Sequence, residues 1–339
     1  MIFKKAYVSA CGTFSVEDAN EPFNPIGGYV TLAKAHSDTA DRKSAQTTMN
    51  TDSTGLDSNL CSFLDVAALA NISTVWQGKE DGEWHARGDP IEIAINVFAA
   101  RFGWSRTRLV GAEKPSWKTL VEFPFDSDVK KMSVVLENTE TDQLQVFTKG
   151  AVERVLQSCS MSYVTSDSDN STEMTDDHSS RILNTMEEFA SYGLRVLALA
   201  SRVAPSHLDY GSELERNQVE CDLIFRGLIG LYDPPRVKSA ASVKECRQAG
   251  IEVHMLTGDH PGTARAIAID VGILPSRTKI VNLPKDVVDA LVMTAGEFDK
   301  LGDDQIDKLP QLPLVVARCA PNTKVRMIEA RKRFAAMVC

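Results

Sequence analysis

The last third of the chain alternates short apolar stretches with amphipathic ones, and this alternation restricts the fold more than any other feature. Strand patterns occupy 251–256, 312–318 and 335–339, and helical patterns occupy 236–249, 262–272 and 322–334. In the first of these helices, one stripe carries Val237, Ala240, Val243 and Cys246, and Gly250 supplies the stop. Neighbouring parallel strands need a crossover, which a helix normally supplies. The residues that follow Pro234 and Pro235 in the sequence are therefore predicted to form a parallel sheet with right-handed crossovers.

The first two thirds of the chain show strand and helix signals without this rhythm. Residues 130–137 and 144–149 flank a polar turn, which is typical of a hairpin, and 193–203 and 222–232 resemble further strands. A helix is predicted over 89–104, beginning at Asp89. We therefore expect an α/β protein with two domains: an α+β domain around an antiparallel sheet over 1–230, and an incomplete Rossmann-like domain over 231–339.

Composition excludes several classes of protein. A length of 339 residues suggests about two domains, and a net charge of −9 argues against a nucleic-acid partner. No apolar run reaches the ~18 residues of a membrane span. The seven cysteines form no C-x-x-C pair and no zinc pattern, so no metal site is predicted and reduced thiols are expected. Polar residues dominate 36–59 and 158–180, which we interpret as surface loops.

The strongest chemical signal is Thr257-Gly258-Asp259, between a predicted parallel strand and a helix. Ligands of open α/β sheets bind at the carboxyl ends of strands. The Thr257 hydroxyl, the bare backbone of Gly258 and the helix N–H groups are suited to phosphate oxygens. The alternative is that Thr257 and Asp259 only cap the next helix.

A wider set of segments resembles the P-type ion-pumping ATPases, in that family's order and over nearly the whole chain. The matching segments are 88–95 (GDPIEIAI), 123–135 (FPFDSDVKKMSVV), 147–156 (FTKGAVERVL), 192–200 (YGLRVLALA), 232–236 (YDPPR), 255–268 (MLTGDHPGTARAIA) and 316–330 (VARCAPNTKVRMIEA). Residues 20–30 and 88–104 most resemble the fungal sodium/potassium-efflux branch. Ser127 stands where calcium pumps carry an arginine, which argues against a calcium pump.

The resemblance implies an ATP site in the first domain. Phe125 matches the family's adenine-stacking phenylalanine, with Phe123 as the alternative, and Glu92 matches the acceptor for the adenine amino group. The cations implied beside the nucleotide are Lys130, Lys149 and Arg195. Gly150 follows Lys149, and its missing side chain lets a ligand approach the backbone.

The second domain is implied to handle the phosphoryl group. Thr257, Gly258 and Asp259 match the family's phosphate-side motif, Lys324 its phosphate-site lysine, and Arg318 a nearby nucleotide contact. Phosphoryl transfer needs such charge neutralisation. The implied cofactors are ATP and Mg²⁺, although most Mg²⁺ ligands of the family have no counterpart here.

The family's nucleophile motif, D-K-T-G-T, and its G-D-G-x-N-D loop are both absent. We therefore expect a portion of a pump from the cytoplasmic face of a membrane, whose partners are the transmembrane and actuator domains that it lacks. The chain alone is expected to bind ATP without turning it over, so whether it is itself an enzyme stays open. The alternatives are a soluble haloacid-dehalogenase-like phosphatase and a non-catalytic nucleotide-binding module.

Overall fold

The computed structural model describes residues 1–19, 21–34, 47–49, 51, 55–163, 171–205, 214–276 and 290–338. The chain forms two compact units. Unit 1 contains 1–186 and 196–232, and unit 2 contains 187–195 and 233–339.

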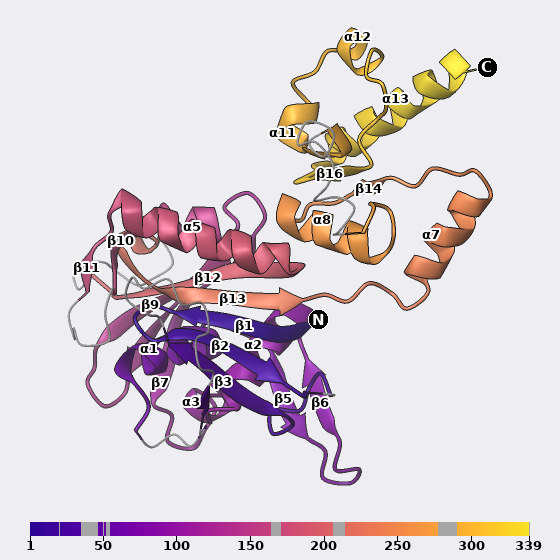
Figure 1. The fold of residues 1–339 in the computed structure, drawn as a ribbon. Coiled ribbons are helices and arrows are strands. Elements are labelled where there is room, and N and C mark those ends of the chain that lie inside the picture. Colours follow the sequence, from indigo (N-terminus) through magenta and orange to yellow (C-terminus); the bar gives the residue numbers. More distant parts are fainter. Residues whose placement is uncertain are drawn as a thin grey trace. The chain divides into compact units, whose positions relative to one another are not determined.

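Unit 1 is built on one large, mainly antiparallel sheet (Figure 1). Its main path runs β4-β3-β2-β1-β13-β12-β9-β8-β7, and β10 joins it by pairing in parallel with β13. The strands are β1 (Ile2–Val8), β2 (Gly12–Glu17), β3 (Tyr29–Lys34), β4 (Thr47–Thr48), β7 (Trp117–Asp126), β8 (Lys131–Asn138), β9 (Leu144–Ala151), β10 (Cys159–Ser162), β11 (Thr172–Glu173), β12 (Leu194–Val203) and β13 (Leu223–Tyr232). The predicted hairpin is confirmed as β8 and β9, and so are the strands now seen as β12 and β13.

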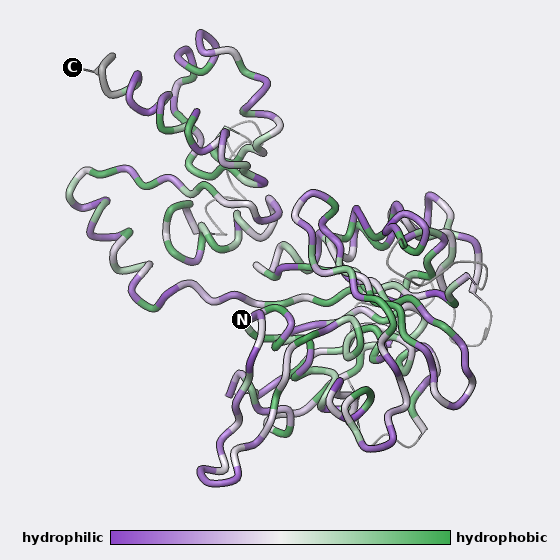
Figure 2. Tube along the Cα trace, turned by 180° about the vertical axis from the view of Figure 1, so that it is seen from behind, coloured by the Kyte–Doolittle hydropathy of each residue, from purple (hydrophilic) through white to green (hydrophobic). Residues whose placement is uncertain are grey.

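Helices α1 and α2 pack on this sheet and form the core of unit 1 with it. Phe63, Phe98 and Phe102 are almost fully buried, and the Phe98 ring stacks on Phe3 of β1 at 3.8 Å between ring centroids. In Figure 2 the tip of the small hairpin formed by β5 (Thr74–Gln77) and β6 (Trp84–Arg87) is hydrophilic. The helices are α1 (Ser58–Leu69), α2 (Pro90–Ala100), α3 (Arg106–Leu109), α4 (Val152–Leu156), α5 (Asp176–Ser191) and α6 (Arg216–Val219). The last turn of α5 and the first two residues of β12 belong to unit 2.

Unit 2 contains a three-stranded parallel sheet in the order β14-β16-β15. The prediction that one chain contains both an antiparallel and a parallel sheet is therefore confirmed. The strands are β14 (Met255–Leu256), β15 (Val292–Thr294) and β16 (Val315–Ala317). The helices are α7 (Ser239–Gln248), α8 (Pro261–Asp270), α11 (Ala295–Phe298), α12 (Asp303–Ile306) and α13 (Pro321–Val338).

Several predicted elements differ in the structure. The strand expected over 335–339 is wrong, because α13 continues through Val338. Ala and Met are strong helix formers, and none of residues 335–338 is a helix-breaking Gly or Pro. The segment 158–180 is not only loop, since it contributes β10, β11 and the start of α5. Residues 164–170 of it lie outside the described part. So does most of the other predicted loop, 36–59, whose described residues include β4 and the first two residues of α1. The α7 stripe is not buried: Val237 is 99% exposed and no α7 residue is buried.

Candidate functional site

A cavity of about 300 Å³ in unit 1 gathers several of the predicted site residues. It lies where the start of α2 meets the ends of β7 and β9 and the start of β8. Its walls combine aliphatic, aromatic and charged side chains: Ile72, Asp89, Ile91, Glu92, Pro124, Phe125, Met132, Lys149, Gly150 and Leu197. Glu92, Phe125, Lys149 and Gly150 thus come together from three segments of the sequence. The aliphatic lining residues carried no sequence signal of their own, because apolar residues of this kind occur throughout the core.

The floor of the cavity holds a buried ion pair. Lys149 Nζ lies 2.6 Å from Glu92 Oε1, and the two side chains are only 8% and 9% exposed. Burial lowers the pKa of Lys149 from its usual value, while the carboxylate of Glu92 opposes that shift. The Ile72 N–H donates to Glu92 Oε2 at 3.2 Å. Glu92 is therefore not a solvated surface carboxylate.

Local sequence explains how α2 presents Glu92. Asp89 caps the helix, accepting from the Ile91 N–H at 2.8 Å, and Pro90 occupies the first turn, where its missing N–H has no helical partner to lose. Glu92 follows in that turn, where the helix dipole favours negative charge.

The aromatic wall is Phe125, whose side chain remains 64% exposed although it lines the cavity. The β7–β8 register shifts between Phe123 and Asp126, so Pro124 and Phe125 lie in an irregular stretch of the strand. Phe123 does not line the cavity; its ring lies under the Arg216 guanidinium at 5.5 Å. Met132, which also lines the cavity, is 2% exposed and belongs to the core.

Gly150 has a packing requirement of its own. A Cβ at this position would lie 2.4 Å from the carbonyl oxygen of Lys130, the residue before β8. Lys130 itself is exposed and ends a tight turn with a φ of 58°, and its carbonyl accepts from the Ala151 N–H at 3.0 Å. Lys130 thus adjoins Gly150 and Ala151 but is not among the residues that line the cavity.

In unit 2, Thr257, Gly258 and Asp259 lie at the carboxyl end of β14, before α8. The Thr257 hydroxyl accepts from the Asp259 N–H at 3.1 Å, and the Arg318 N–H donates to the Asp259 carbonyl at 3.0 Å. The side chain that caps α8 is that of His260. Helix capping therefore does not account for Thr257 and Asp259.

Three cationic predicted residues belong to the same unit. Arg195 Nη2 lies 2.9 Å from Asp259 Oδ1 and 3.8 Å from Asp233 Oδ2. Arg318 follows β16 with a φ of 58°, and Lys324 is exposed in the first turn of α13, shortly after it. Arg195 is thus paired with the carboxylate of the Thr-Gly-Asp motif rather than grouped with the residues of the first cavity.

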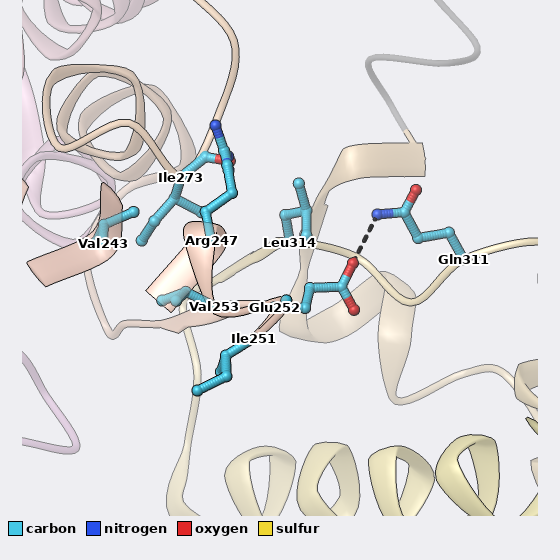
Figure 3. Close-up of a pocket in the computed structure, with 9 residues that line it drawn as sticks. Val243, Arg247, Ile251, Glu252, Val253, Ile273, Gln311 and Leu314 are labelled. Carbon is cyan, nitrogen blue, oxygen red and sulfur yellow. Dashed lines mark hydrogen bonds between the residues drawn. The ribbon is translucent and has the colours of Figure 1, made fainter. Parts of the chain in front are cut away.

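A second cavity, of about 330 Å³, lies in unit 2 at the amino ends of β14 and β16, away from residues 257–259 (Figure 3). It is bordered by the end of α7 and by the residues that precede β14 and β16, and Gln311 donates to Glu252 within it at 3.1 Å. None of the predicted site residues lines it. Because ligands of parallel sheets bind at the carboxyl ends of strands, we assign no function to this cavity.

Comparison with known proteins decides the family. The model of the P-type ATPase cytoplasmic domain N matches residues 59–238, which is more than half of the chain and includes the whole first cavity. The chain belongs to the P-type ATPase family. The resemblance seen in the sequence is thereby confirmed.

This P-type ATPase chain is 38% identical to the sodium/potassium exporting P-type ATPase 2 of Saccharomyces cerevisiae, over 99% of its own length and 34% of that protein. It is 41% identical to the sodium/potassium exporting P-type ATPase cta3 of Schizosaccharomyces pombe, over 99% and 31% of the two chains. A calcium-transporting ATPase of Bacillus subtilis is 32% identical to the chain, over 78% of the chain and 27% of that protein. The chain spans about a third of the length of the fungal relatives it matches.

The part of this P-type ATPase that the structure describes contains no helix both long enough and apolar enough to cross a membrane.

Proposed function

We propose that this chain is the ATP-binding portion of a P-type cation pump, acting at the cytoplasmic face of a membrane. The observation that carries the proposal is the cavity of unit 1, which combines an exposed aromatic ring with a buried carboxylate–ammonium pair. An adenine ring fits this combination because stacking on an aromatic side chain contributes about 1–3 kcal/mol. The Glu92 carboxylate supplies the acceptor for the adenine amino group, and the Lys149 ammonium pairs with that carboxylate at 2.6 Å.

Residues 1–230 form the nucleotide-binding domain in this proposal, and 231–339 form part of a haloacid-dehalogenase-like phosphorylation domain. Thr257, Gly258 and Asp259, at the carboxyl end of β14, orient the phosphoryl group without accepting it. The charges of Arg195, Arg318 and Lys324 support that role, since they lie in the same unit and phosphoryl groups require neutralisation. Lys130, which adjoins Gly150, is assigned to the nucleotide because it lies within the family's nucleotide motif.

ATP acts in such transfers as its Mg²⁺ complex. The described residues hold no group of three His, Cys, Asp or Glu side chains placed to bind a metal ion. We therefore assign no Mg²⁺ ligand to this chain.

The parent pump would couple ATP hydrolysis to the export of sodium or potassium. The names of the fungal relatives, which describe sodium/potassium exporters, support this choice of ion over calcium. Its partners in the same polypeptide would be the transmembrane and actuator domains. No D-K-T-G-T motif occurs in the 339 residues, so we propose that the chain binds ATP without forming an acyl phosphate.

The test is an ATP titration followed by methyl NMR. The cavity carries the methyl groups of Ile72, Ile91, Met132 and Leu197, which report directly on occupancy. We expect saturable shifts of these methyls and an affinity about 5- to 150-fold weaker in Phe125→Ala, as the loss of 1–3 kcal/mol of stacking requires.

Tyr29→Ala is the matched control. Tyr29 is an exposed aromatic residue (44%) on β3 of the same unit and does not line the cavity. Absence of cavity shifts in the wild-type chain, or equal losses in the two variants, would refute the proposal.

A further inference from the structure

Arg216 of the short helix α6 contacts the irregular part of β7 from a distant point in the sequence. Its guanidinium donates to the carbonyl oxygen of Pro124 and, at 3.2 Å, to that of Lys131 at the start of β8. The same group lies 5.5 Å from the ring centroid of Phe123, which places a cation over an aromatic face. One side chain therefore connects both strands of the hairpin that carries Phe125.

The position of Phe125 depends on such a contact because the usual constraints are absent. Its side chain is 64% exposed, so burial does not hold it in place. The register shift between Phe123 and Asp126 leaves Pro124 and Phe125 without paired residues on β8. Proline also has no N–H to donate to a neighbouring strand. The contact from Arg216 to the Pro124 carbonyl thus ties down the backbone immediately before Phe125.

Arg216 is itself held by a buried polar network. Its guanidinium donates to Glu220 Oε1 at 2.9 Å, and Glu220 Oε2 lies 3.0 Å from Lys131 Nζ. The Ser133 hydroxyl also donates to Glu220, at 2.7 Å. The Glu220 side chain is 2% exposed and that of Lys131 is 9% exposed. Buried hydrogen-bonded networks of this kind restrict side chains to one arrangement.

We propose that Arg216 is a positioning residue for the aromatic wall of the nucleotide cavity. It contacts no residue of the ion-paired floor in the described structure, and it acts through Pro124 on Phe125. This role rests on the proposed function, since it concerns the same cavity. It also explains why a segment more than 80 residues from the β7–β8 turn carries an arginine and a buried glutamate together.

The test is a double-mutant cycle between Arg216→Gln and Phe125→Leu, read as ATP affinity by methyl NMR of the whole chain. Leucine removes the aromatic face while keeping an apolar wall, so binding stays measurable. We expect R216Q to weaken ATP binding by roughly tenfold when Phe125 is present, and by less than about twofold when F125L is already in place. A role confined to general stability predicts the same loss in both backgrounds.

Arg202→Gln is the matched control. Arg202 contacts the Cys221 carbonyl, close in sequence to Glu220, but makes no contact with β7 in the described structure. It is expected to leave ATP affinity within about twofold of wild type. Where R216Q does not fold, the same cycle is run with R216K, which keeps a charge beside Glu220 but lacks the planar fork that contacts two carbonyl oxygens.

The outcomes separate this role from the proposed function. A wild-type chain without ATP-induced cavity shifts refutes the proposed function, and this role with it. A wild type that binds ATP, together with equal losses for the Arg216 variant in both backgrounds or no loss at all, refutes only the role of Arg216.

Discussion

Removing the ammonium group of Lys149 is expected to destabilise unit 1 and to weaken its ATP affinity by about ten- to a hundredfold. Lys149→Met leaves the Glu92 carboxylate buried, with the Ile72 N–H at 3.2 Å as its remaining hydrogen-bond donor. Breaking a buried ion pair by removing one partner typically costs about 3–5 kcal/mol, because an uncompensated charge stays behind. That is a large share of the 5–15 kcal/mol by which native domains are usually stable.

Two further variants isolate the cause. Glu92→Gln/Lys149→Met replaces both charges and keeps an acceptor for the Ile72 N–H, so we expect most of the lost stability to return. Lys118→Met removes a lysine from an exposed pair with Glu137 (3.1 Å) on the same sheet and should cost no more than about 1 kcal/mol. ATP binding should stay weakened in the double variant, since the cavity then has neither charge.

The assay is urea unfolding followed by tryptophan fluorescence. All four tryptophans lie in unit 1, at positions 76, 84, 104 and 117, so the signal reports on that unit alone. With an m-value of about 1–3 kcal/mol/M, a loss of 3–5 kcal/mol moves the midpoint by at least about 1 M. Equal costs for K149M and K118M would refute the argument from burial, as would a double variant no more stable than K149M.

Three other predictions test separate parts of the chain. Burial raises the pKa of Asp65 to about 6, above its unfolded value, so the native state holds more protons and stability falls as pH rises from roughly 4 to 6. Asp65→Asn keeps an acceptor for the Trp104 Nε1–H, which lies 2.9 Å from Asp65 Oδ1. This variant should stabilise unit 1 by up to about 3 kcal/mol at pH 7.5 and by less at pH 4.5. Equal effects at both pH values would contradict the prediction. Trypsin should cut first after Arg236 or Lys238, since both are exposed and Val237 between them is 99% exposed. A resistant C-terminal piece with a degraded N-terminal piece would overturn this prediction. Incubation with γ-labelled ATP and Mg²⁺ should yield no acid-stable, hydroxylamine-sensitive phosphoprotein, and a labelled band that disappears on substitution of one aspartate would show that the chain has its own nucleophile.

Local patterns in the sequence determined the elements that depend on neighbouring residues. Asp89 and Pro90 mark the start of α2 because an N-cap and a first-turn proline act within one helical turn. The β8–β9 hairpin follows from two alternating stretches around a polar turn. The family motifs also identified Glu92, Phe125 and Lys149 as candidates, although they lie far apart in the sequence.

Only the tertiary structure decided which of these residues meet and in what environment. Glu92 and Lys149 are 57 positions apart, and nothing near either one indicates that they form a buried pair. Arg195 and Asp259 come together in unit 2, and Arg216 reaches Pro124 across 92 positions. The reason is physical: the pKa of a charged group and the energy of its contacts depend on burial, and burial is set by segments that only the fold brings together. The sequence thus specifies the chemical groups, while the packing of distant segments determines whether a lysine is a free cation or half of a buried ion pair.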